Sequence, residues 1–201
     1  MGQSGLNFCN KYATTKFSLP SHRVNLSIKE LIICQLKDLE VETSQAYTIK
    51  RGEWTLEKYG LDANWSIKLE FGKSIAVWHV ATDICYRSEP ESSKSVPNKV
   101  ETTKILSYYM MHLLLFCPTL SFCNNNENFT QAYPNVEKFF EEAQFNGEKL
   151  ATSLMEKQDK WEIMSNIWVE MLCYAVSCCS VNHHVQELRH GGQFLTRLAS
   201  T

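Results

Sequence analysis

The histidine and the aspartate of the motif WHxxTDxC, at residues 78–85, have a spacing that could support chemistry. His79 and Asp83 stand four residues apart in a segment of helical periodicity, so both side chains lie on one face of the predicted helix. This arrangement suits two metal ligands, or a carboxylate that holds an imidazole in one tautomer. No second pair of ligands follows at a diagnostic spacing. We therefore favour a structural hydrogen bond between these helix side chains.

A second motif, WVEMLCYA at residues 168–175, places a glutamate inside the most apolar predicted helix. An unpaired carboxylate is costly in an apolar environment, so a buried Glu170 requires a partner. Arg189 or Lys160 is the expected partner. The same motif carries a cysteine one turn further along the helix.

That cysteine, Cys173, could act as a nucleophile if His184 or His79 lies beside it in the fold, because a thiol needs a neighbouring base to ionise. Buried cysteines usually serve as small apolar side chains, and we favour that interpretation. The run Cys178-Cys179-x4-His184 resembles part of a zinc site. Strong zinc motifs, however, have paired ligands at both ends of the site, so a zinc site here is the less favoured interpretation.

The composition limits the function classes. The 201 residues are 44% hydrophobic and 21% charged, with a formal net charge of −2. Such a chain can bury a core, and it lacks the bulk positive charge that drives nonspecific nucleic-acid binding. Its basic residues form no stripe interleaved with aromatic residues, so we expect no nucleic-acid partner. The eight cysteines include no Cys-x-x-Cys pair, which favours reduced thiols in a cytosolic setting.

The candidate residues lie within a series of predicted helices. Apolar residues recur at helical spacing over residues 27–42, 74–86, 105–117, 134–147 and 159–176. Shorter helical segments are expected near residues 51–60, 149–157 and 183–198, with Pro134 at the first position of its helix. Residues 65–71 alternate between apolar and polar and predict one short extended segment. We predict an all-α fold, an irregular bundle of about five to seven helices.

Residues 1–24 lack periodicity and predict a weakly ordered lead-in to a single helical domain over residues 25–201. Within that domain, residues 87–101 contain two prolines and four serines and predict a flexible linker. The most apolar run, residues 105–117, is shorter than the ~20 residues that cross a bilayer. We therefore expect no transmembrane span, and no apolar stretch near the N-terminus predicts a secretory signal.

Six segments of the chain, taken in order, resemble a known plant family. They are SIKELI (27–32), RGEW (51–54), WHVATDICY (78–86), LSYYM (106–110), WVEMLCYA (168–175) and the stretch from His184 through Gly191-Gly192 to Leu195-Thr196. This order is similar to the plant domain of unknown function 594, which usually follows its companion, domain of unknown function 4220. The resemblance implies a module at the C-terminal side of multi-pass membrane proteins. It brings no activity, substrate or cofactor, and so it assigns no catalytic residue.

The resemblance also marks the chain as a short or truncated member, since the membrane-spanning part of the relatives is absent. We predict a non-enzymatic helical interaction or regulatory module, cytoplasmic or peripheral to a membrane, with no cofactor. Its expected partners are membrane-protein relatives or other proteins. The alternative is a metal-binding or Cys/His-dependent hydrolytic site built from the two motifs, with His79, Asp83, Cys173 and His184 as its candidate residues.

Overall fold

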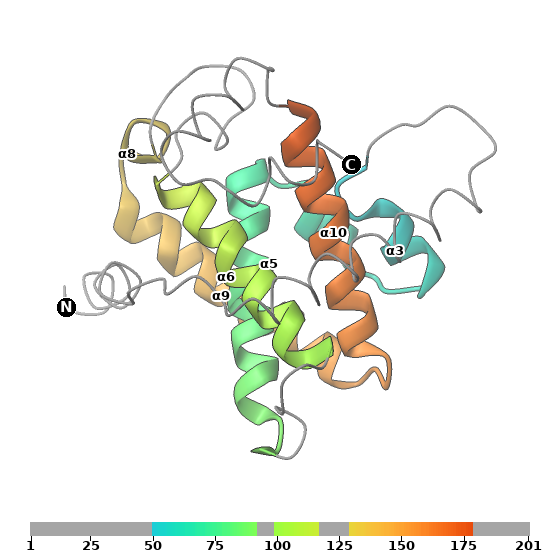
Figure 1. The fold of residues 1–201 in the computed structure, drawn as a ribbon. Coiled ribbons are helices and arrows are strands. Elements are labelled where there is room, and N and C mark those ends of the chain that lie inside the picture. Colours follow the sequence, from blue (N-terminus) through green and yellow to red (C-terminus); the bar gives the residue numbers. More distant parts are fainter. Residues whose placement is uncertain (1–49, 92–98, 117–128, 179–201) are drawn as a thin grey trace.

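A computed structural model describes residues 50–91, 99–116 and 129–178 of the chain (Figure 1). These residues form seven helices and no strand. In chain order the helices are α3 (Glu53–Lys58), α4 (Asn64–Ile67), α5 (Phe71–Ser88), α6 (Lys99–Phe116), α8 (Phe129–Ala132), α9 (Val136–Met155) and α10 (Lys160–Cys178). The predicted all-α fold is confirmed for this part of the chain.

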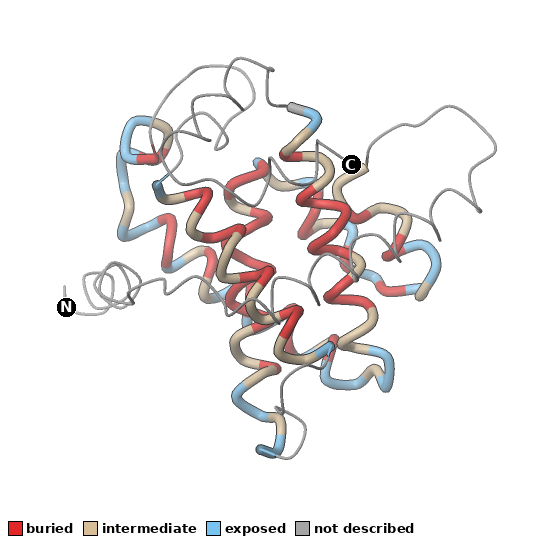
Figure 2. Tube along the Cα trace, viewed as in Figure 1, coloured by how far each residue is buried: buried red, intermediate tan, exposed pale blue. Residues whose placement is uncertain are grey.

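Helix α5 is the centre of the described fold, because it packs against both α9 and α6. Its buried face combines the small or branched side chains of Val77, Val80 and Ala81 with the fully buried indole of Trp78. Small side chains let neighbouring helices come close, and the large indole fills the space that remains. Helix α6 in turn packs against α10, and α10 packs against α3. The buried residues face the middle of this bundle (Figure 2).

Helix α9 is one continuous helix, so the predicted break between residues 134–147 and 149–157 is wrong. Gly147 lies inside it, where an added Cβ atom would meet Val80 Cγ1 at 2.5 Å. The glycine therefore permits a close approach of α9 to α5 rather than ending the helix. The helix begins at Val136, two residues after the predicted start at Pro134, because Asn135 Oδ1 accepts the backbone N–H of Lys138 at 2.9 Å and caps the first turn.

The extended segment predicted at residues 65–71 is also wrong, because part of it belongs to α4 and its last residue, Phe71, begins α5. A lone strand leaves its backbone groups unpaired, whereas local turns satisfy them. The Ser66 amide donates to the Ala63 carbonyl at 2.9 Å, and the Lys68 amide donates to the Asn64 carbonyl at 3.2 Å. The apolar residue Ile67 is buried by the bundle rather than by a sheet.

Helices occupy both ends of the segment predicted as a linker at residues 87–101. Helix α5 continues to Ser88 and α6 begins at Lys99, six residues before the predicted start at residue 105. Side chains in this first turn of α6 already contact other helices: Glu101 accepts the Tyr86 hydroxyl at 2.8 Å, and Lys99 pairs with Glu162. These contacts explain why the helix extends into a segment of weak apolar periodicity. Residues 92–98 lie outside the described ranges.

Other predictions concern parts of the chain that the structure does not describe. They are the lead-in at residues 1–24, the helix at 27–42 and the helix at 183–198. Within the described ranges, no helix has both the length and the apolar character that a bilayer span requires.

Candidate functional site

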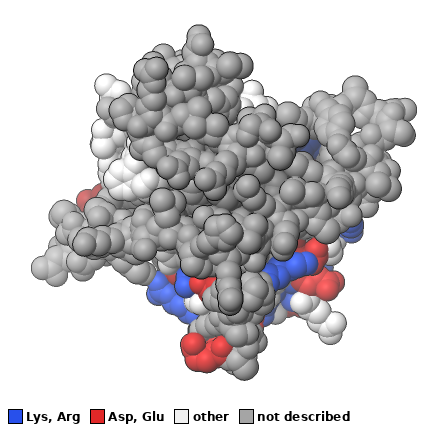
Figure 3. All heavy atoms as spheres, viewed as in Figure 1, with Lys and Arg blue, Asp and Glu red and all other residues white. Residues whose placement is uncertain are grey.

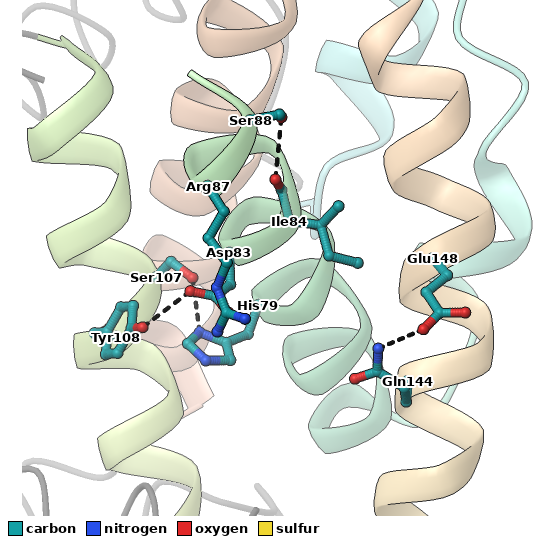
Figure 4. Close-up of polar contacts among 9 residues, drawn as sticks. All are labelled: His79, Asp83, Ile84, Arg87, Ser88, Ser107, Tyr108, Gln144 and Glu148. Carbon is teal, nitrogen blue, oxygen red and sulfur yellow. Dashed lines mark hydrogen bonds and ion pairs between the residues drawn. The ribbon is translucent and has the colours of Figure 1, made fainter. Parts of the chain in front are cut away.

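The histidine of the first motif lies in the core between α5 and α6. His79 is fully buried, and its Nδ1 atom lies 2.9 Å from the Ser107 hydroxyl oxygen. Its ring meets the Tyr108 ring edge-on, with 4.8 Å between the ring centroids. Both partners are consecutive residues of α6 (Figure 4). In these contacts His79 joins α5 to α6.

The aspartate of the motif faces the same helix one turn further along. Asp83 Oδ1 accepts the Tyr108 hydroxyl at 3.1 Å, while Oδ2 pairs with Arg87 on α5 itself (Figure 4). Burial, and then the neighbouring Asp83 charge, raise the pKa of Tyr108 to about 12. Tyr108 therefore stays protonated at neutral pH and donates its hydrogen bond. Tyr86 donates a further hydrogen bond to Glu101 on α6. Polar contacts therefore join three successive turns of α5, at His79, Asp83 and Tyr86, to α6.

A chain of three buried hydrogen bonds connects the two motifs. Trp168 Nε1 donates to Thr82 Oγ1 at 3.1 Å, and Thr82 Oγ1 donates to the Trp78 carbonyl at 2.7 Å. Trp78 Nε1 donates to Ser66 Oγ at 3.1 Å. Sequence reasoning missed Thr82 and Ser66 as members of the site. The only signal for Thr82 was its place in the motif four residues after a tryptophan, and nothing in the sequence indicated its partner on α10.

The glutamate of the second motif connects α10 to α3. Glu170 is 4% exposed, and its Oε1 atom accepts both the backbone N–H of Thr55 at 3.0 Å and the Thr55 hydroxyl at 2.5 Å. The prediction that Lys160 pairs with Glu170 is wrong, because Lys160 Nζ lies 2.6 Å from Glu89. Arg189, the other expected partner, lies outside the described residues. Thr55 was not foreseen, since no short sequence pattern connects it to Glu170.

Two opposing effects act on the ionisation of Glu170. Burial raises the pKa of its carboxyl group, and the hydroxyl and amide of Thr55 lower it by favouring the charged form; the net direction is upward. The second oxygen, Oε2, is buried and has no hydrogen-bond partner in the described part of the chain. The Oε1 atom is therefore stabilised by hydrogen bonds from α3, whereas burial of the Oε2 atom without such a bond costs free energy.

The two described cysteines of the motifs are free thiols in apolar surroundings. Burial raises the pKa of Cys85 to about 11. Burial and the nearby Glu170 carboxylate raise the pKa of Cys173 to about 11 as well. Since the thiolate is the reactive form, both groups are unreactive at neutral pH in this environment.

The described residues contain no group of three or more His, Cys, Asp or Glu side chains that could hold a metal ion. His79 and Asp83 are brought together against α6, whereas Cys173 lies on α10 beside Glu170. His184 and Cys179 fall outside the described ranges. The convergence of His79, Asp83, Cys173 and His184 in one site therefore remains a prediction.

Charged side chains of both signs are mixed on the described surface. Figure 3 shows lysine and arginine next to aspartate and glutamate along the lower part of that face. Ion pairs among the described residues also join opposite charges, including Lys73 with Glu142 at 3.2 Å and Lys160 with Glu89 at 2.6 Å. Basic residues on the described part of this face are thus interspersed with acidic ones.

Comparison with known proteins gives one match. Residues 153–199 match the model of the family described as "Protein of unknown function, DUF594". The matched region begins in the last turn of α9, includes all of α10 with Glu170 and Cys173, and continues beyond the described residues. No curated protein and no solved structure matches the chain. The segment WVEMLCYA, which carries part of the sequence resemblance, lies inside the match, so the match over residues 153–199 supports the resemblance to the DUF594 family.

Proposed function

We propose that the chain is a non-enzymatic helical interaction or regulatory module. The observation that carries this proposal is the use of the motif side chains. His79 bonds to Ser107, Asp83 to Tyr108, and Glu170 to Thr55, and each bond joins two different helices. Side chains that could do chemistry are thus engaged in holding the bundle together, which leaves the outer faces of the helices as its functional surface.

The family supplies the cellular context of the proposal. The resemblance of the six sequence segments, together with the match over residues 153–199, supports a role like that of the C-terminal part of plant multi-pass membrane proteins. On this proposal the chain acts on the cytosolic side of a membrane, beside membrane-protein relatives. In this role the chain binds a partner through its helices and does not convert a substrate.

Binding to a full-length relative tests the proposal. The purified full chain is mixed with a detergent-solubilised multi-pass member of the family, and the mixture is separated by size-exclusion chromatography. An unrelated helical protein of similar size is the control. We expect the chain to co-elute with the relative and not with the control. If the chain co-elutes with none of several full-length relatives, the proposal is contradicted.

The alternative is a metal-binding or Cys/His-dependent hydrolytic site. It requires His184 to join His79 and Asp83, and it requires Cys173 to ionise near neutral pH. The raised pKa of Cys173 counts against the hydrolytic form of this alternative. The metal-binding form is tested by elemental analysis of the purified protein.

A further inference from the structure

Helix α9 presents an outer face on which a large aromatic side chain is exposed. Phe145 is 72% exposed and Met155 is 41% exposed, although the opposite face of the same helix packs against α5. The exposed positions recur every three or four residues, so they share one side of the helix (Figure 2). We call this row the α9 outer stripe; it consists of Glu137, Glu141, Phe145, Glu148, Thr152 and Met155.

The α9 outer stripe is acidic around its exposed phenylalanine. Glu141 and Glu148 stand one turn before and one turn after Phe145 on the same side of the helix. Neither Glu137 nor Glu141 forms an ion pair with any described residue. Glu148 bonds only to a neutral side chain among those described, the amide of Gln144 at 2.6 Å (Figure 4). Among the residues that the structure describes, these three carboxylates therefore have no positively charged partner.

The lysines of α9 next to the stripe do not neutralise it. Lys138 Nζ lies 3.8 Å from Glu142, which also pairs with Lys73 from α5 at 3.2 Å. Lys149 Nζ lies over the ring of Trp65, 5.1 Å from its centroid. Both lysines are thus turned toward partners at the flanks of the helix. Phe145 is thus exposed beside Glu141 and Glu148, two carboxylates that form no ion pair among the described residues.

We propose that the α9 outer stripe is a docking surface for a cationic amphipathic helix of another protein. An apolar side chain of that helix would pack on Phe145, and its lysines or arginines would pair with Glu137, Glu141 and Glu148. The negative charge of the stripe disfavours an anionic lipid surface, because like charges repel. This inference rests on the proposed role as an interaction module and assigns to that role a surface and a partner chemistry.

The test uses the full chain and a synthetic amidated peptide of lysine and leucine, about four helical turns long, whose leucines form one face. Isothermal titration calorimetry measures its affinity for the wild type, for Phe145→Ala and for the double variant Glu141→Gln/Glu148→Gln. The matched control is Phe116→Ala, which removes a 54% exposed aromatic side chain from α6. Circular dichroism checks that each variant keeps its helical content.

We expect the wild type to bind the peptide and the affinity to fall about tenfold in Phe145→Ala and in the double variant. The affinity should stay unchanged in Phe116→Ala, and it should weaken as salt is added. No binding by the wild type, or equal losses in Phe145→Ala and Phe116→Ala, would overturn the proposal. A membrane result would also overturn it. If the wild type binds vesicles made of equal parts of phosphatidylcholine and phosphatidylserine, and Phe145→Ala abolishes that binding, the stripe faces a membrane.

The two proposals can fail separately. If the chain co-elutes with a full-length relative but the stripe variants bind the peptide as the wild type does, the docking surface is wrong and the interaction role stands. If no relative binds while the peptide affinity depends on Phe145, the docking surface stands and the proposed association with membrane-protein relatives fails.

Discussion

Glu170 shows how a buried charged residue can organise the packing of a small helix. Its carboxylate accepts two hydrogen bonds from Thr55, one from the backbone and one from the hydroxyl. Hydrogen bonds to a charged acceptor are stronger than neutral ones, and they offset part of the cost of burial. Because Oε2 has no partner among the described residues, the offset is incomplete, and the pKa of Glu170 stays above its ordinary value.

This raised pKa predicts a pH dependence of stability. The folded chain holds a proton on Glu170 at pH values where the unfolded chain has released it. The stabilisation from Glu170 is therefore full below the unfolded-state pKa and is lost as the pH rises through the folded-state pKa. We expect the unfolding free energy of the wild type, relative to that of Glu170→Gln, to increase as the pH falls from neutral toward the ordinary glutamate pKa.

Urea unfolding at several pH values measures this difference. Glu57→Gln, which changes an exposed glutamate on α3, is the matched control for the substitution itself. A difference between the wild type and Glu170→Gln that is constant with pH, or that moves the other way, would show that Glu170 is not perturbed by burial.

The cysteines give a second prediction at the scale of single residues. Because the pKa values of Cys85 and Cys173 are both about 11, few molecules carry a thiolate at neutral pH. We expect iodoacetamide to label each of them at least about tenfold more slowly in the folded chain than in urea. Mass spectrometry of the digested protein measures both rates. A Cys173 that labels faster in the folded chain would instead support a catalytic thiol.

Sequence reasoning identified the polar residues but not their partners. His79, Asp83 and Glu170 stood out because their motifs place polar groups in apolar helices. Their partners Ser107, Tyr108 and Thr55 are distant in the sequence and carry no pattern of their own. Such pairs depend on how the helices are arranged, and local periodicity contains no information about that arrangement.

At the scale of elements, the contact between α5 and α9 depends on Gly147. In an exposed helix, replacement of glycine by alanine adds stability, up to about 1 kcal/mol. Here the new Cβ atom would lie 2.5 Å from Val80 Cγ1 and 3.1 Å from the Val77 carbonyl oxygen. Because a backbone atom is among these neighbours, the two helices must separate, and the steric cost exceeds the gain in helix propensity.

We therefore expect Gly147→Ala to lower the unfolding free energy by about 1–3 kcal/mol. Val80→Ala should relieve part of this strain, so the double variant should lose less stability than the sum of the two single variants. Thr152→Ala, on the exposed side of α9, should change stability by no more than about 0.5 kcal/mol. Additive single effects in chemical denaturation would mean that Gly147 and Val80 are not in contact.

The elements also show why local patterns identify helices better than they identify boundaries. Apolar periodicity predicted α5, α6 and α10, because each buries a long face against its neighbours. It failed at Gly147, where a glycine marks a helix contact and not a helix end. It failed again at residues 65–71, where apolar and polar residues alternate over a short helix and a turn. In both places, packing between helices determines the local structure.

At the scale of the whole molecule, the described bundle directs its polar motif residues inward. Its exposed apolar side chains, Phe116, Phe145 and Met155, lie on the outside of α6 and α9. A site that bound a substrate would need polar groups directed at a shared opening. This distribution supports the proposal that the chain binds partners through its helix surfaces. The sequence resemblance to the DUF594 family is supported by the match over residues 153–199.

We propose that the motif residues join helices through hydrogen bonds and do not bind a metal. The metal content of the full chain tests this claim most directly. Elemental analysis of the purified protein also includes His184 and Cys179, which lie outside the described residues. We predict less than about one tenth of an equivalent of zinc or iron per chain. About one equivalent of either metal, lost in a His79→Ala or His184→Ala variant that still folds, would contradict the claim.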